Sequence, residues 1–397
     1  MLSYLLLTVL ATVPATSPVA NDPVVASLVF PELARTQAAL DQVHLGVLAN
    51  LVFPLAVRAS VVPIGGQAMV RQLVWDKSRD APKAAVVAGP SEVCGPLDSG
   101  TIANACIDVR ALFRAIAQGD HAVTYSSLVE RVGLDSLEAA RATFRLEPDG
   151  ALATDVLLSF ASSPQGLLGA LGPAIALPDF LAGAAQVGVE AFAVASVRPE
   201  TLYFALAKLV SYQAPIEYSL WKLQLSELEH RLGGSLSHDA LGDDPQVLGL
   251  AIFQTGQAIS AVSVGVHDAK LLAHILSAYL ELMRPTHPQL TVSTATRGTR
   301  IYTSVQGLGG KSLSALLLAF DGNRAVVAMT RQAADELLTM MMTRPVPGPT
   351  ATPISAVASG FVNHGHEVSA LRNLRSAFRV EGVPNELRLR IGTRQAR

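Results

Sequence analysis

The segment Ser314–Leu338, SALLLAFDGNRAVVAMTRQAADELL, contains two short apolar runs, 316–320 and 325–329, on either side of Asp-Gly-Asn. Asp, Gly and Asn tolerate positive backbone φ angles at little cost, so the residues at 321–323 predict a hairpin turn between two strands. The turn accounts for the acidic residue Asp321, and no chemical role is needed to explain its position.

A helix is predicted directly after this hairpin. Thr330 is a favoured N-cap residue, and Ala334, Leu337 and Leu338 follow at spacings that put them on one helical face. The local unit is therefore strand, turn, strand and helix.

The order of strand and helix recurs at 190–210 and at 257–280, where Pro199 and Asp268 mark the predicted helix starts. A weaker copy occupies 102–116. In the first copy we expect an apolar stripe on the helix, formed by Leu202, Leu206 and Leu209.

Further hairpins are predicted around the turn-forming pairs at 149–150, 297–298 and 384–385. The flanking residues alternate between apolar and polar types, which is typical of antiparallel sheets with one wet face. The sequence predicts an α+β fold: extended, mostly antiparallel sheets, helices packed on one face, and two loosely duplicated halves.

The predicted organisation has a signal peptide over 1–20, an N-terminal half over 21–178 and a C-terminal half over 179–397. The segment 344–353, RPVPGPTATP, is a Pro-rich loop within the second half.

Export is predicted from the apolar run Leu2–Val13, which small residues follow at positions where a signal peptidase could cut. The run is preceded by neither Lys nor Arg, so a misassigned start or an apolar helix retained in the fold remains an alternative. Export places the protein in the bacterial periplasm or outside the cell.

Composition excludes several classes of protein. Hydrophobic residues make up 50% of the chain and charged residues 16%, which indicates a large core and excludes a mainly disordered state. A net charge of −2 and 5% aromatic residues argue against nucleic-acid binding. The two long uncharged runs, 156–178 and 246–266, are interrupted by turn residues or alternate at strand period, so no transmembrane span is predicted in the mature chain.

Cys94 and Cys106 enclose a short loop that contains Gly and Pro. In an oxidising compartment these residues could form a disulfide, and the alternative is a pair of buried thiols. Further ligands at short spacing are lacking, so a zinc site is not predicted there.

Four other motifs resemble chemical sites, but none predicts a catalytic, cofactor or metal residue. His364 and His366 could share a metal from one strand, with His238-Asp239 as distant ligands, but a capped helix start explains them as well. The glycines of Gln306–Ser312 lack phosphate-loop spacing, and Ser219–Lys222 lacks the companion motifs of penicillin-recognising enzymes. The acidic segment Ser237–Asp244 is explained by a capped helix and a polar turn.

Seven Arg residues lie between Arg372 and Arg397. Arg388 and Arg390 alternate with apolar residues, which predicts the wet side of a strand. Attachment to anionic lipid or envelope polymer is a second hypothesis for these residues.

Three segments, 132–160, 176–206 and 228–244, contain in order a Gly-Leu-Asp, a Pro-Asp before a strand-helix unit, and a Leu-Gly before an Asp-Ala-Leu step. In this order and spacing the chain resembles exported bacterial proteins of unknown function from planctomycete- and myxobacterium-type genomes. The resemblance implies no established activity, so no catalytic residue can be transferred from it.

The sequence favours an exported, non-catalytic protein that is a binding or structural component of the bacterial envelope. Its partner would be an unknown protein or an apolar ligand. One alternative is a carrier that encloses a lipid or other apolar ligand between sheet and helices. A second alternative is a hydrolase whose active site is assembled from distant residues.

Overall fold

The structure is a computed structural model that describes residues 24–30, 69–76, 81–88, 101–111, 133–147, 151–176, 189–253, 261–307, 315–342, 355–364, 374–383 and 385–395. The predicted signal segment 1–20, Cys94, His366 and the Pro-rich loop 344–353 lie outside these residues.

The chain divides into two compact units. The first combines Met1–Pro164 with Asn363–Arg397, and the second is Gln165–Val362. The α+β class is confirmed, because each unit contains an antiparallel sheet and helices are also present. The single division predicted near residue 178 lies outside the described residues.

The sheet of the first unit has the strand order β17-β18-β6-β5-β4-β1-β2-β3, and each neighbouring pair is antiparallel. These strands are β1 (Val24–Phe30), β2 (Met69–Asp76), β3 (Ala81–Ala88), β4 (Thr101–Asp108), β5 (Leu137–Leu146), β6 (Leu152–Phe160), β17 (Leu374–Val383) and β18 (Glu386–Gln395). The last strands were expected in the C-terminal half, 179–397, but β18 pairs with β6, so they join the first unit. The predicted hairpin at 384–385 is confirmed, and Asn385 has a φ of 64° in its turn.

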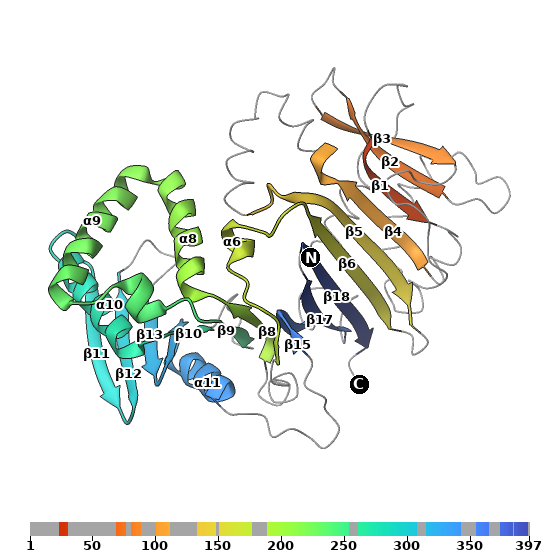
Figure 1. Cartoon of the computed structure of the whole chain (residues 1–397). Helices are drawn as coiled ribbons and strands as arrows, with labels where there is room; N and C mark the ends of the chain where they lie inside the picture. The colour runs from red at the N-terminus through yellow and green to blue at the C-terminus, as the bar shows by residue number, and fades with distance from the viewer. Residues whose placement is uncertain are drawn as a thin grey trace. The chain divides into compact units, whose positions relative to one another are not determined.

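The sheet of the second unit has the order β11-β12-β13-β14-β10-β9-β8-β16, again with antiparallel neighbours. Figure 1 labels β8 to β13 of this sheet. Its strands are β8 (Val189–Val197), β9 (Gln246–Phe253), β10 (Ala261–Gly265), β11 (Thr291–Arg297), β12 (Arg300–Gln306), β13 (Ala315–Asp321), β14 (Arg324–Ala328) and β16 (Ala358–His364). A separate small pair joins β7 (Ile175–Ala176) and β15 (Ser355–Ala356).

The helices of the second unit are α6 (Gly166–Gly169), α8 (Pro199–Gln213), α9 (Pro215–Leu232), the π-helix η1 (Leu236–Leu241), α10 (Ala269–Met283) and α11 (Arg331–Met342). The predicted starts of α8 and α10 are confirmed. Pro199 occupies the first turn of α8. The Asp268 carboxylate accepts hydrogen bonds from the backbone N–H groups of Lys270 and Leu271, which caps α10.

The hairpin predicted around Asp321 is confirmed. Strands β13 and β14 pair through Asp321 and Arg324, and Gly322 has a φ of 58° in the turn between them. The Ala333 N–H donates to the Thr330 Oγ1 atom at 3.2 Å, so Thr330 caps α11 as predicted.

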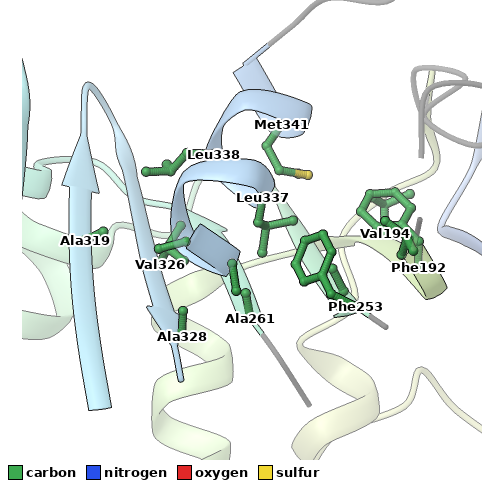
Figure 2. Packing of buried hydrophobic residues seen from close by; sticks show 14 of the residues in the cluster. Phe192, Val194, Phe253, Ala261, Ala319, Val326, Ala328, Leu337, Leu338 and Met341 are labelled. Carbon is green, nitrogen blue, oxygen red and sulfur yellow. The ribbon is translucent and has the colours of Figure 1, made fainter. Parts of the chain in front are cut away.

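One hydrophobic core of the second unit lies between α11 and the sheet. Leu337, Leu338 and Met341 of α11 pack in one buried cluster with Ala319 of β13 and Val326 of β14 (Figure 2). The predicted apolar face of this helix is therefore confirmed, and its leucines are fully buried.

A second core lies on the opposite face of the same sheet. Phe320 packs in a cluster with Leu272 and Ile275 of α10, whereas its neighbour Ala319 packs in the cluster with α11. Successive side chains of a strand point to opposite faces. Helices therefore cover both faces of this sheet, and the expectation that they lie on one face is wrong for the second unit.

Two finer expectations can be compared with the burial of individual side chains. Leu206, expected in the buried stripe of α8, is 47% exposed, and the small residues Ala205 and Ala207 are buried in its place. The alternation predicted for β10 is confirmed: Ala261 and Ser263 are fully buried, and the intervening valines are half-buried.

Candidate functional site

The α8–α9 helical hairpin is built by local signals that lie close together in the sequence. Only Ala214 separates the two helices, and Pro215 occupies the first turn of α9, where its missing N–H leaves no hydrogen bond unmade (Figure 1). Gly233 ends α9 with a φ of 71°, in the left-handed conformation that favours glycine.

One face of α9 packs into the core of the second unit. Leu225 is buried in the cluster that includes α10, and Trp221 and Leu228 pack against it. Tyr203 of α8 contacts the Trp221 ring with centroids 6.1 Å apart. Burial, followed by the charge of Glu229, raises the pKa of Tyr203 to about 12, so its hydroxyl stays neutral at ordinary pH.

The other face of α9 exposes large apolar side chains. Ile216, Leu220 and Leu223 are 72%, 58% and 69% exposed. Their spacing of i, i+4 and i+7 places them in one row along the helix, and we call this row the α9 outer stripe. On α8, Phe204 and Val210 are also more than half exposed.

Charged side chains border the α9 outer stripe. Glu227 continues the same row one turn beyond Leu223 and forms an ion pair with Arg231. Glu217 follows Ile216 in the sequence and is exposed. Lys222 is exposed as well, but it does not border the stripe, because it lies about 130° around the helix from the middle of the stripe.

A second candidate surface surrounds η1, a type of helix that is rare and is frequently found at functional sites. The Ser235 Oγ atom accepts hydrogen bonds from the His238 and Asp239 N–H groups at 3.2 and 3.1 Å. In return, Asp239 Oδ2 accepts from the Ser235 N–H at 2.8 Å and from its hydroxyl at 3.0 Å. The two hydrogen bonds that the Asp239 carboxylate accepts from Ser235 lower its pKa, so this carboxylate stays ionised at neutral pH.

An open cavity of about 590 Å³ lies beside η1. It is lined by His238, Asp239, Gly242, Asp243, Asp244, His267, Asp268 and Leu271. Several of these groups already have partners within the chain. Thr201 donates to Asp243 at 2.8 Å, Asp268 caps α10, and the His238 Nδ1 atom lies 3.8 Å from a Glu200 carboxylate oxygen.

Of the histidines with a possible metal-ligand role, His364 and His238 belong to different units, and His366 lies outside the described residues. His364 ends β16, whereas His238 lies in η1 and lines the cavity. Within the described part of the chain, no group of three or more His, Cys, Asp or Glu side chains is arranged to hold a metal ion.

Two of the remaining sequence motifs have structural surroundings that explain them, whereas most of Gln306–Ser312 lies outside the described residues. Ser219 is exposed on α9 and donates to the Pro215 carbonyl oxygen at 2.8 Å. Arg388 and Arg390 are exposed in β18, as expected for the wet side of a strand. Arg390 also lies 3.5 Å from Asp155 and 3.6 Å from Glu381, so acidic neighbours balance part of this basic end.

No family model, curated protein or solved structure matches this chain. The similarity to exported bacterial proteins therefore remains a prediction from short motifs. Among the described helices, none is both long and apolar enough to cross a bilayer.

The α9 outer stripe is not among the features predicted from the sequence, although the sequence contains a signal for it. In α9, PIEYSLWKLQLSELEHRL, apolar residues fall on two opposite sides of the helix. A helix with only a core-facing stripe would have its apolar residues on one side. The second set begins at Ile216 and forms the exposed α9 outer stripe.

Proposed function

We propose that the protein is an exported, non-catalytic binding protein of the bacterial envelope and that the α9 outer stripe is its docking surface. The exposure of Ile216, Leu220 and Leu223 supports this proposal most directly. A soluble protein gains nothing in stability from leaving such a row in water, and rows of this kind mark interaction sites.

The spacing of the stripe favours a protein partner with an apolar groove. Anchors at i, i+4 and i+7 are those with which one helix face fills a groove on another protein. Glu217 lies beside the anchors, whereas Glu227 is already paired with Arg231, so the rim of the groove is expected to carry Lys or Arg opposite Glu217. These bordering residues have no net positive charge, which suits a lipid surface less well, because bacterial membranes attract basic segments.

Site-specific photo-crosslinking in envelope extracts of the source organism tests this docking surface. A photoreactive amino acid at Leu220 or at Leu223 is expected to give the same crosslinked protein. The matched control places the amino acid at Lys222, on the same helix but away from the stripe, and is expected to give little of that product.

The captured partner is then purified and titrated with the chain itself. The double variant Leu220→Gln, Leu223→Gln is expected to bind at least about tenfold more weakly than the wild type, since each buried leucine contributes about 1.5–3 kcal/mol. Its urea unfolding midpoint should change little, because both side chains are exposed in the free protein. Equal binding by variant and wild type would contradict the proposal. So would stripe-dependent binding to protein-free vesicles, which would instead assign the surface to lipid.

Export, the disulfide and the internal duplication are part of the same proposal. Leu2–Val13 supports export, and the mass of the mature chain would show whether residues 1–20 are removed. Cys106 is buried in β4, and mass spectrometry of the unreduced protein would show whether it is bonded to Cys94. The strand-helix units β8-α8 and β10-α10 support a duplication.

The other functions considered from sequence gain less support. An apolar-ligand carrier would need a cavity lined by hydrophobic side chains, whereas the cavity beside η1 has Leu271 among acidic and histidine residues. For a hydrolase the same lining offers Asp and His side chains, but Asp239, Asp243 and Asp268 already accept hydrogen bonds within the chain.

A further inference from the structure

Strand β11, TVSTATR, forms one edge of the sheet in the second unit. It pairs with β12 along its whole length, from Thr291 opposite Gln306 to Arg297 opposite Arg300, without a bulge. Among the described strands, none pairs with its other side. Every side chain of β11 except Val292 is exposed.

The β11 edge lacks the features that usually prevent edge strands from pairing with other chains. Such strands commonly contain Pro, Lys or a bulge. Strand β3, at one end of the order in the first unit, has Pro82 and Lys83. In β11 there is neither, and Arg297 at its very end is the single charged residue.

The register shows which backbone groups of β11 face outward. Residue pairs that flank a two-residue turn exchange hydrogen bonds, and the pattern then alternates along the strands. Starting from Arg297 and Arg300, the N–H groups of Val292, Thr294 and Thr296 therefore point away from β12. The Thr294 and Thr303 hydroxyls lie 3.3 Å apart, consistent with the close side chains of a pair that exchanges no backbone bonds.

We propose that β11 is a self-pairing edge, through which two copies of this chain join antiparallel about a two-fold axis at Thr294. This register alone pairs all residues of β11. It places Thr294 opposite its own copy, Val292 opposite Thr296, and Ser293 opposite Ala295. The inference goes beyond the proposed function and does not depend on the α9 outer stripe.

The composition of β11 favours a second copy over an unrelated peptide. In the symmetric register the two Arg297 residues lie at opposite ends of the pair, so no like charges face each other. Threonine, valine and serine have small side chains, and the Thr294 pair on the axis is a Thr–Thr cross-strand contact of the kind that stabilises antiparallel pairs. A contact of this kind is isologous and closes at the dimer.

Cysteine crosslinking tests the register directly. Thr294→Cys places two thiols opposite each other across the axis and is expected to give a disulfide-linked dimer on mild oxidation of the full chain. Thr296→Cys is the matched control, because its two copies lie four residues apart along the strands, about 14 Å. The native Cys94 and Cys106 are present in both variants. Equal crosslinking at both positions, or none at 294, would overturn the proposal.

A second pair of variants separates pairing from folding. Thr294→Pro removes an outward N–H without removing a bond to β12, as edge strands tolerate. It is expected to abolish the concentration-dependent dimer seen by analytical ultracentrifugation, whereas Thr294→Val should retain it. Circular dichroism checks that both variants are folded. A wild-type chain that stays monomeric up to its solubility limit contradicts self-pairing, as would a dimer that Thr294→Pro leaves unchanged.

Discussion

Arg300 and Asp321 form an ion pair between β12 and β13 in which the Arg300 Nε atom lies 2.9 Å from the Asp321 Oδ2 atom. Asp321 is only 6% exposed, and its second oxygen accepts a hydrogen bond from Thr299 at 2.9 Å. Arg300 also donates to Asp335 of α11 at 2.9 Å. One guanidinium therefore links the hairpin turn to the helix that covers the sheet.

Replacing Arg300 is expected to destabilise the protein strongly. The variant Arg300→Met leaves the Asp321 carboxylate buried without its cation, which typically costs about 3 kcal/mol. Arg231→Met on α9 is the control, because its ion pair with Glu227 is exposed and contributes less than about 1 kcal/mol. Urea unfolding measures the loss of unfolding free energy in both variants. Equal losses would show that the buried ion pair contributes no more to stability than the exposed one.

Asp335 is expected to make stability depend on pH in the acid range. Burial acts to raise its pKa, but hydrogen bonds from Tyr302 and Arg300 outweigh burial and lower it. The unfolded chain therefore binds a proton at higher pH than the folded chain does. The stabilisation is complete above the ordinary Asp pKa of about 3.9 and is lost as pH falls through the lower folded pKa.

The variant Asp335→Asn tests this dependence by urea unfolding at several pH values. Its deficit relative to wild type is expected to be about 1 kcal/mol at pH 6, a modest figure because the carboxylate is partly exposed. The deficit should shrink as the pH is lowered below about 4. A deficit that stays the same down to pH 3 would assign the loss to packing rather than to charge.

Local signals in the sequence predicted the turns and helix starts, because a turn or a cap depends on residues only a few positions apart. Gly322, Asn385 and Asp268 are examples. The sequence could not show that Arg300 meets Asp335, or that β18 pairs with β6, because these contacts join distant segments.

The burial of β13 on both faces could be predicted only in part from the sequence. Its apolar run, ALLLAF, has no alternation, a pattern typical of strands covered on both sides. Ala319 and Phe320 indeed pack against different helices. The signal was therefore present, but a short apolar run does not identify which helix covers which face.

Core and stripe leucines are expected to respond differently to truncation. Leu337 is fully buried between α11 and the sheet, so Leu337→Ala should cost about 2–5 kcal/mol through lost contacts and a cavity. Leu223 is mostly exposed, so Leu223→Ala should change stability by less than about 0.5 kcal/mol. Thermal and urea unfolding compare the two. A large loss for Leu223→Ala would mean that the stripe is needed for folding and would weaken its assignment as a docking surface.

The hairpin turn gives a last prediction. Gly322 has a φ of 58°, and a Cβ added there would meet no atom within 4 Å, so only backbone strain would oppose a side chain. Gly322→Ala is therefore expected to cost about 1–2 kcal/mol. Gly392→Ala in β18 is the control, because that position is also open but has no positive φ. Its stability in urea should match or slightly exceed wild type, since alanine reduces the freedom of the unfolded chain. If both variants lose the same amount, the cause is loss of glycine itself and not the left-handed turn that the sequence predicted.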